Sequence, residues 1–332
     1  MSKTCCEIPN VQPVSTVLVP LDVLGAWKVR WGIGRDNYLI NPGLYALGDP
    51  NGNSPVLVSA NYKLTFDTLR KNLTGLDCWL LILDTKGINV WCAAGKGTFG
   101  TEELVNRIEK SRLTEFVTHR KLILPQLGAP GISAHEVTRR TGFSVIYGPI
   151  RAEDIKAFIS AGFRATREMR RVRFNFRDRL VVAPMELAEV AKLTLPIYGV
   201  LFIINIVAKR QFGINDVVLY VGTICTGAFI TPVLLPFIPG RAFSFKGWLM
   251  GLAWVSLAFW LFGWHAPEFR LLSIGYGLLL PAFSAFLTMN FTGATTYTSP
   301  SGVVREMKIA LPFIFVAALA GAVLVLIKSL FG

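Results

Sequence analysis

The fold of the N-terminal half is decided by the stretch Asn89-Val90-Trp91-Cys92-Ala93-Ala94-Gly95-Lys96-Gly97-Thr98-Phe99-Gly100. The apolar run 78–84 that precedes it predicts a buried strand. The segment 101–108 that follows has a threonine cap, early acids and apolar spacing, which predict a helix continuing to about Phe116. The stretch is therefore a strand-to-helix crossover, on the side of an α/β sheet where ligands usually bind.

Cys92 is the candidate reactive residue of this crossover. A thiol near the start of a helix feels the partial positive charge of unpaired N–H groups, which favours the thiolate. Such a thiolate can serve as a soft metal ligand or a nucleophile. The usual alternative for a lone cysteine near a sheet is an inert buried thiol. Lys96 could favour the thiolate further or point to solvent.

Hydrophobicity is distributed unevenly along the 332 residues. With 52% hydrophobic residues and a mean hydropathy of +0.48, the chain is too apolar for an ordinary soluble protein of this length. Charge is concentrated in the N-terminal half, whereas long uncharged runs dominate the rest. The predicted division is a flexible arm at 1–20, an α/β domain at 21–163, a basic linker at 164–186 and a transmembrane domain at 187–332.

Alternating strand and helix patterns fill the α/β domain. Strands are predicted at 27–31, 37–40, 55–59, 121–125 and 143–147, with a turn at 41–43. Helices are predicted at 64–73 and 133–140. This alternation predicts a largely parallel sheet with right-handed crossovers.

Five apolar runs in the C-terminal part are each near the roughly 20 residues that a membrane-spanning helix needs. They are 193–208, 217–239, 247–264, 271–291 and 309–330. No acidic or basic residue lies deep in any run, which disfavours proton or ion transport.

A basic cluster before the first run sets the expected orientation. It contains Arg164, Arg167, Arg170, Arg171, Arg173, Arg177 and Arg179. Only Glu168 and Asp178 oppose it. Because such clusters mark the cytoplasmic end of a membrane helix, we expect a multi-pass protein of the cell inner (cytoplasmic) membrane with its soluble domain in the cytoplasm. The net charge of +13 is then directed at anionic lipid rather than nucleic acid.

Residues 89–96, Asn-Val-Trp-Cys-Ala-Ala-Gly-Lys, closely resemble the cap-helix signature of the HgcA family, the membrane corrinoid proteins of microbial mercury methylation. Gln126–His135 and Tyr147–Asp154 also resemble the corrinoid domain that this family shares with the large subunit of the corrinoid iron–sulfur protein. The resemblance implies an α/β Rossmann-like corrinoid-binding domain followed by an all-α transmembrane bundle of five helices.

The same resemblance implies a base-off cobalamin or related corrinoid, with Cys92 as the lower axial cobalt ligand. Its implied cofactor-binding neighbours are Asn89, Val90, Trp91, Ala93, Ala94, Gly95 and Lys96. Gly128, Gly131 and Gly148 could let backbone approach the corrin, or be ordinary loop glycines.

The implied activity is methyl transfer from methyl-cobalt to Hg(II), forming methylmercury. A thiolate opposite the methyl group would enrich that carbon in electron density, which suits an electrophilic soft ion. The chain has no Cys-x-x-Cys pair, so a ferredoxin-like 4Fe-4S electron donor resembling HgcB is an implied partner, together with a folate-linked methyl donor. The alternatives are a membrane-anchored methyl carrier of one-carbon metabolism with another acceptor, and a transporter with a cytosolic regulatory domain.

The remaining motifs give weaker indications of function. Cys5 and Cys6 could capture a soft ion such as Hg(II) or be incidental cysteines of the arm, and all five cysteines are expected to be reduced. His119, His135 and His265 lack the aspartate two residues earlier that marks histidine ligation of corrinoids. The glycines of 95–100 match a dinucleotide-binding pattern, but the first lies too far beyond the strand, which disfavours nucleotide binding.

Overall fold

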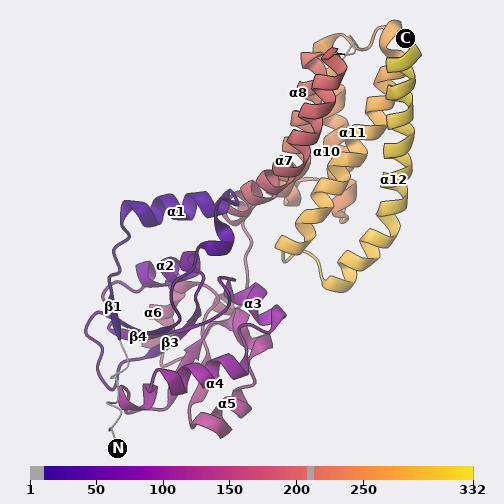
Figure 1. The fold of residues 1–332 in the computed structure, drawn as a ribbon. Helices are drawn as coiled ribbons and strands as arrows, with labels where there is room; N and C mark the ends of the chain where they lie inside the picture. Colours follow the sequence, from indigo (N-terminus) through magenta and orange to yellow (C-terminus); the bar gives the residue numbers. More distant parts are fainter. Residues whose placement is uncertain (1–10, 208–212, 332) are drawn as a thin grey trace, which may run out of the picture. The chain divides into compact units, whose positions relative to one another are not determined.

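The computed structural model describes residues 11–207 and 213–331, which fall into two compact units (Figure 1). The α/β unit takes in the described chain up to Val29 together with Ile33–Val172. The helical unit takes in Arg30–Gly32 and the described chain from Arg173 onward. A helix already begins at Phe176, so the second half of the segment predicted as a linker is helical.

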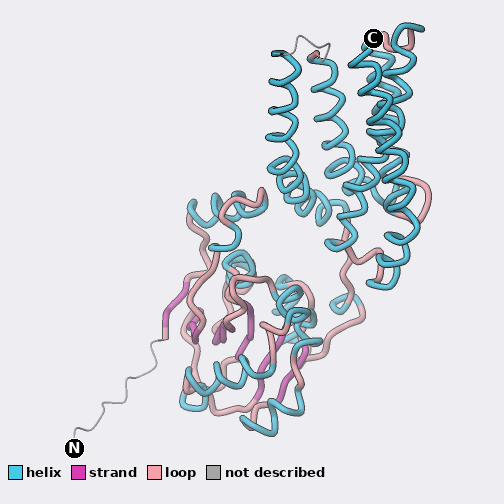
Figure 2. Tube along the Cα trace, turned by 45° about the vertical axis from the view of Figure 1, so that its right-hand side comes forward, coloured by secondary structure: helices cyan, strands magenta, loops and turns pink. Residues whose placement is uncertain are grey.

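A sheet, magenta in Figure 2, forms the centre of the α/β unit. It has six strands in the order β1-β2-β4-β3-β5-β6. Strands β3 to β6 are parallel to their neighbours within that group, β2 runs antiparallel to β4, and β1 is parallel to β2. The predicted largely parallel sheet is therefore confirmed. The strands are β1 Gln12–Val14, β2 Gly43–Leu47, β3 Val56–Ala60, β4 Cys78–Leu83, β5 Lys121–Leu124 and β6 Ser144–Tyr147.

Helices cover both faces of this sheet because the central strands are apolar on both sides. On β4, Leu81 belongs to one core with α4 and α5, whereas Leu80 belongs to a second core with α2 and α6. The helices of this unit are α1 Pro20–Arg30, α2 Lys63–Asn72, α3 Val90–Lys96, α4 Thr101–Lys110, α5 Ala134–Thr141 and α6 Ile155–Ser160.

The sequence prediction was wrong at the N-terminal end of the unit. Residues 27–30 lie in α1 rather than in a strand, and 37–40 contribute only an isolated bridge at Leu39. Strand β2 begins at Gly43, where only a turn was predicted, and β1 lies within the predicted flexible arm. The alternation of apolar and polar residues at 27–31 suggested a strand, but burial follows the helical period. The two buried residues of α1, Asp22 and Val29, are seven residues apart, which is two helical turns.

Ion pairs dock α1 onto α2. The Asp22 carboxylate accepts from Lys63 Nζ at 2.6 Å and also pairs with Arg70, and Asp67 pairs with the same two cations. Burial alone would raise the pKa of Asp22, but the Lys63 hydrogen bond, a Val19 N–H and Arg70 outweigh it and hold that pKa below its usual value. The position of α1 thus depends on charges as well as on the burial of Val29.

The helical unit consists of long apolar helices (Figure 1). They are α7 Phe176–Val207, α8 Ile214–Cys225, the π-helical turn Thr226–Ile230, α9 Thr231–Leu234, α10 Phe243–Phe262, α11 Arg270–Asn290 and α12 Pro300–Phe331. Within the described residues, four segments are long and apolar enough to cross a membrane. They are Ile214–Phe237, Phe243–Phe262, Pro267–Gly293 and Ser301–Ser329. They match the last four predicted runs, and the first run, at the end of α7, stays a prediction.

Small residues allow these helices to approach closely. A Cβ added at Gly251 of α10 would lie 2.7 Å from Ser284 Cβ and 2.9 Å from Pro281 Cα of α11. Ser284 Oγ also donates to the carbonyl of Gly247 at 2.8 Å. Large apolar side chains such as Phe313 and Trp260 instead point outward. This pattern, small residues inside and large apolar ones outside, is typical of helices packed in lipid.

Arg179, a member of the basic cluster, connects three segments of the helical unit. Its buried guanidinium donates to the carbonyls of Val233 at 2.8 Å and Phe174 at 2.8 Å, and to Tyr297 Oη at 3.0 Å. Tyr297 lies in the loop 291–299 between α11 and α12 and also donates to Phe174 O. That loop is thereby anchored within the helical unit.

Replacing Gly251 by leucine should destabilise the helical unit by about 1–3 kcal/mol, because the new side chain would be forced into the α11 backbone. Gly277→Leu on α11 is the matched control, since a Cβ there meets nothing within 4 Å. Thermal unfolding in detergent compares the two variants. Equal melting temperatures would contradict the close packing of α10 on α11.

Candidate functional site

A buried amide organises the loop that leads from the sheet into α3. Asn61 follows β3 directly, and its Oδ1 accepts from Thr85 N at 3.0 Å, Thr85 Oγ1 at 2.9 Å and Gly87 N at 3.1 Å. Gly87 has a φ of 70°, a conformation that favours glycine. Sequence reasoning missed Asn61. The available signal was a polar residue directly after a buried strand, at the carboxyl edge of the sheet.

Asn89 then starts α3. It is the N-cap residue, and its Oδ1 accepts the N–H of Cys92 at 2.9 Å. Removing such a cap typically costs about 1 kcal/mol. Cys92 therefore lies in the first turn of a helix, but that helix is α3 and not the predicted helix from Thr101. In α4 the N-cap is Gly100, the helix ends at Lys110, and Thr101 Oγ1 accepts from Ser133 N.

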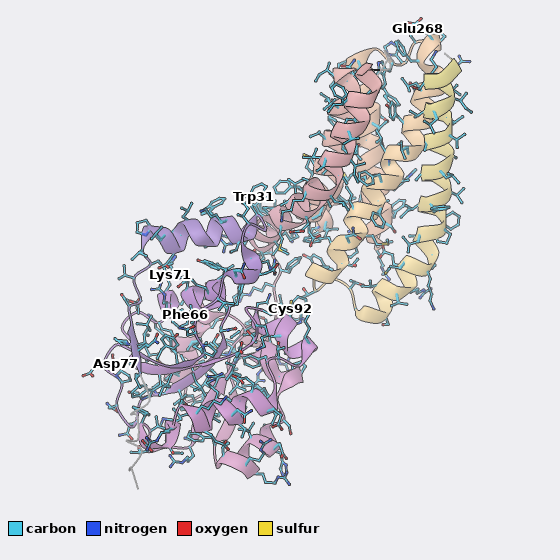
Figure 3. All side chains as sticks on the ribbon, viewed as in Figure 1. Trp31, Phe66, Lys71, Asp77, Cys92 and Glu268 are labelled. Atoms are coloured by element: carbon cyan, nitrogen blue, oxygen red, sulfur yellow. The ribbon has the colours of Figure 1, made fainter. Side chains whose placement is uncertain are left out.

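Helix α3 divides its residues between two faces. Val90, Ala93 and Ala94 are buried against the sheet. Trp91, Cys92, Gly95 and Lys96 are exposed. Residues three and four apart share a helix face, so Cys92, Gly95 and Lys96 lie together. A Cβ at Gly95 would meet nothing within 4 Å. The thiol thus lies on an open face beside a position without a side chain (Figure 3).

Two of the predicted glycines hold α3 in place from the side. A Cβ at Gly131 would lie 2.1 Å from Phe99 O and 3.2 Å from Ala94 Cα. A Cβ at Gly128 would lie 2.5 Å from Phe99 Cε1. The 3-10 turn η3, Gln126–Gly131, can therefore close against α3 and the residues after it only because both positions are glycine.

Gly148 has a similar but looser role. A Cβ there would lie 3.1 Å from Ile123 Cγ2, at the end of β5. Tyr147, just before it, donates from Oη to the carbonyl of Ile132 at 3.0 Å and so fixes the loop after η3. Burial raises the pKa of this tyrosine, which keeps the hydroxyl a donor. Direct contact of these glycines with a cofactor stays a prediction.

The other candidate ligands are placed differently. His119 lies with Nε2 2.9 Å from Ser54 O, and its Nδ1 accepts from Lys121 N, so both ring nitrogens contact backbone. Cys78 is buried in β4, where burial raises its pKa to about 12, and Cys225 is half-buried in α8. Cys5 and Cys6 lie outside the described residues.

Cys92 is therefore the exposed thiol of the described chain. In the same described ranges, no three His, Cys, Asp or Glu side chains gather as a metal site. The arrangement offers a single sulfur ligand on a firmly seated, seven-residue helix. Chemically it can act as one axial donor to a metal whose other ligands come from elsewhere.

Residues 35–159 match the family described as CdhD, the CO dehydrogenase/acetyl-CoA synthase delta subunit. This stretch contains β2 to β6 and α3. It also contains the residues that hold α3 in place, which we call the seat of α3: Asn61, Asn89, Gly128 and Gly131. Similar curated proteins are gamma subunits of the acetyl-CoA decarbonylase/synthase complex. The one from Methanopyrus kandleri is 35% identical over 127 residues, which is 38% of this chain and 27% of the relative. The one from Archaeoglobus fulgidus is 35% identical over 122 residues, 36% of this chain and 26% of the relative.

The described α/β unit thus contains a domain homologous to part of the gamma subunit of the acetyl-CoA decarbonylase/synthase complex. The chain spans only about a quarter of the length of these relatives, 27% and 26%. The matched residues all lie within the α/β unit.

Replacing Gly131 by alanine should loosen α3, because the new methyl group would overlap the Phe99 carbonyl. Hydrogen exchange of the α3 amides should then become faster, with an overpacking cost of about 1–3 kcal/mol. Gly95→Ala is the control. It adds a methyl group to an open helical position and should slow exchange slightly. Unchanged exchange in the Gly131 variant would contradict the proposed seat.

Proposed function

We propose that this chain, whose residues 35–159 form a domain homologous to the gamma subunit of acetyl-CoA decarbonylase/synthase, is a corrinoid-dependent methyltransferase that methylates Hg(II). The observation that carries the proposal is the exposed Cys92 thiol on α3, within the homologous domain. Cobalamin or a related corrinoid in its base-off state is the proposed cofactor, and Cys92 sulfur its lower axial ligand.

The residues of the α3 face fit such a group. A base-off corrinoid needs one protein donor at its lower face, and Cys92 is a single exposed sulfur. Gly95, one turn further, leaves space on the same face for a flat ring system, since a Cβ there would touch nothing. Trp91 adds an exposed aromatic surface beside the thiol. Both ring nitrogens of His119 contact the backbone, so this histidine cannot take the place of Cys92 as the protein donor.

When bound, a methylated corrinoid would supply a cobalt-held methyl group for transfer. The chain's own contribution is to hold a sulfur donor in a fixed direction. Asn89 caps α3 through the Cys92 N–H, and Asn61 fixes the loop before it. Lys96 lies one turn from Cys92 on the same exposed face of α3. A thiolate at Cys92 would supply electron density that suits transfer of a methyl group, with its bonding electron pair, to electrophilic Hg(II).

Further partners belong to the proposal. The sequence has no Cys-x-x-Cys pair for an iron–sulfur cluster, so reducing electrons are expected from a ferredoxin-like 4Fe-4S protein resembling HgcB. A folate-linked compound is the proposed methyl donor. We place the helical unit in the inner membrane and the α/β unit in the cytoplasm, on the basis of the four apolar segments and the arginine cluster.

Cys92→Ala should abolish mercury methylation. Changes in the second shell of a metal site typically cost 10–100-fold, and loss of the direct ligand should cost more than about 100-fold. The measurement is methylmercury formed by purified, corrinoid-loaded protein, together with the absorbance spectrum of the cofactor. Cys225→Ala, which removes a half-buried cysteine in α8, is the matched control and should retain activity. An active Cys92→Ala protein with an unchanged cobalt spectrum would remove the thiol from this role.

A second candidate function is a membrane-anchored methyl carrier of one-carbon metabolism. The names of the related proteins favour it, because they belong to an acetyl-CoA decarbonylase/synthase complex. Offering the methylated protein equal concentrations of Hg(II) and a low-potential nickel or thiol acceptor separates the candidates. We expect demethylation to be faster with Hg(II). Transfer only to the other acceptor would favour the carrier, and protein that carries no corrinoid after anaerobic purification would contradict both.

A further inference from the structure

Helix α1 buries Asp22 and Val29 on the side that faces the protein, whereas its large apolar side chains lie on the outward side. Asp22 is buried, whereas Leu21 is 76% exposed and Trp27 60% exposed. Val23 and Leu24 are also exposed. In a helix that packs on a soluble domain, the apolar stripe normally faces the core. The reversed arrangement of α1 needs a second apolar environment on its outer side.

The exposed residues form one continuous face. With about 100° of rotation per residue, Val23, Trp27, Leu24 and Leu21 fall within an arc of about 160°. Asp22 and Val29, the two buried residues, fall on the opposite side. Lys28 lies within the arc close to Leu21 and is exposed, so its charged end can reach past the apolar side chains.

The orientation of this face is fixed by the anchoring described above. Asp22 is held by Lys63 and Arg70 from α2. Arg70 Nη1 also donates to the carbonyls of Ser15 at 2.6 Å and Val17 at 2.8 Å, on the chain entering α1. These bonds cannot form if the helix is rotated to bury its apolar side chains. The outward apolar face is therefore built in and does not arise from loose packing.

Gly25 strengthens this attachment. A Cβ at this position would lie 2.4 Å from Tyr38 Oη, so a larger residue would push α1 away. With glycine there, the Tyr38 hydroxyl donates to the carbonyl of Asp22 at 3.3 Å. Helix α1 is thus attached along its inner side by polar contacts at both Asp22 and Tyr38.

We propose that α1 lies in the plane of the membrane, with Leu21, Val23, Leu24 and Trp27 inserted at the headgroup–acyl boundary and Lys28 directed at anionic headgroups. Interfacial helices combine an apolar face, tryptophan and basic residues in this way. The four apolar segments of the helical unit bring a bilayer to the same chain, at a high effective concentration. The inference rests on the membrane insertion proposed above and on nothing in the cofactor chemistry.

Tryptophan fluorescence of the full chain in lipid nanodiscs tests the inference. Two quenchers are compared, acrylamide in the water and phospholipid brominated near the headgroup end of its acyl chains. The contribution of one tryptophan is the wild-type signal minus that of its Trp→Phe variant. Trp27→Phe reports on α1, and Trp91→Phe, which removes the exposed tryptophan of α3, is the matched control. Trp260→Phe on α10 reports on the helical unit.

We expect the Trp27 contribution to lose most of its intensity to brominated lipid and little to acrylamide, and the Trp91 contribution to do the reverse. Leu24→Asp should shift the Trp27 contribution towards acrylamide. If acrylamide quenches Trp27 as strongly as Trp91, the face is in water and the inference is wrong. If neither quencher reaches Trp27, another protein surface covers it, which also overturns the inference.

The Trp260 signal distinguishes the interfacial position of α1 from the membrane insertion of the helical unit. Quenching of Trp260 by brominated lipid with none of Trp27 would reject the interfacial helix and leave the membrane domain in place. Loss of lipid quenching at both positions would reject the membrane insertion itself. Protein without bound corrinoid is used, because the proposed cofactor would cover Trp91, and none of these outcomes depends on mercury.

Discussion

The position of the reactive thiol depends on one buried amide oxygen. Three donors from the loop after β4 converge on Asn61 Oδ1, and that oxygen therefore fixes where α3 begins. Water cannot replace this partner, because Asn61 is buried and each unpaired donor would carry a desolvation cost of about 1–3 kcal/mol. The parallel pairing of β3 with β4 brings Asn61 and the loop to the same edge of the sheet. The sheet thus determines, through Asn61, the position of the helix that carries Cys92.

Two glycines allow the neighbouring turn η3 to pack directly against α3 and the residues that follow it. Gly131 and Gly128 bring η3 against Ala94 and Phe99, so the backbone itself forms the wall of the seat. A short helix of seven residues has little stability of its own, and tertiary contacts must supply it. Glycines that suggest cofactor contact in the sequence thus have a demonstrable packing function. The two functions are compatible, because packing uses the Cα side and leaves the outer face of α3 open.

The sequence predicted strongly apolar elements well and polar attachments poorly. Strands β3 to β6 and helices α2, α4 and α5 follow from apolar runs, and Cys92, the candidate site residue of the sequence, is exposed in the structure. Asn61 was missed because its partners are distant in sequence and only the sheet brings them together. The end of α1, residues 27–30, was predicted as part of a strand because the large apolar residues of this helix face outward and ion pairs at Asp22 help to hold its inner side. Periodicity locates a continuous buried apolar face, and it fails where the large apolar residues lie on the exposed side.

The two unusual surfaces of the α/β unit lie on different parts of it. Helix α1 is attached to α2, which covers the core that contains Leu80, whereas α3 belongs to the core that contains Leu81. A bilayer against α1 therefore need not cover Cys92, and the α3 face remains open to a cofactor and to soluble partners. Lipid contact through α1 would also restrict the rotation of the α/β unit at the membrane surface. That restriction would present the thiol-bearing face in one direction to an incoming electron donor, which lowers the orientational cost of each encounter.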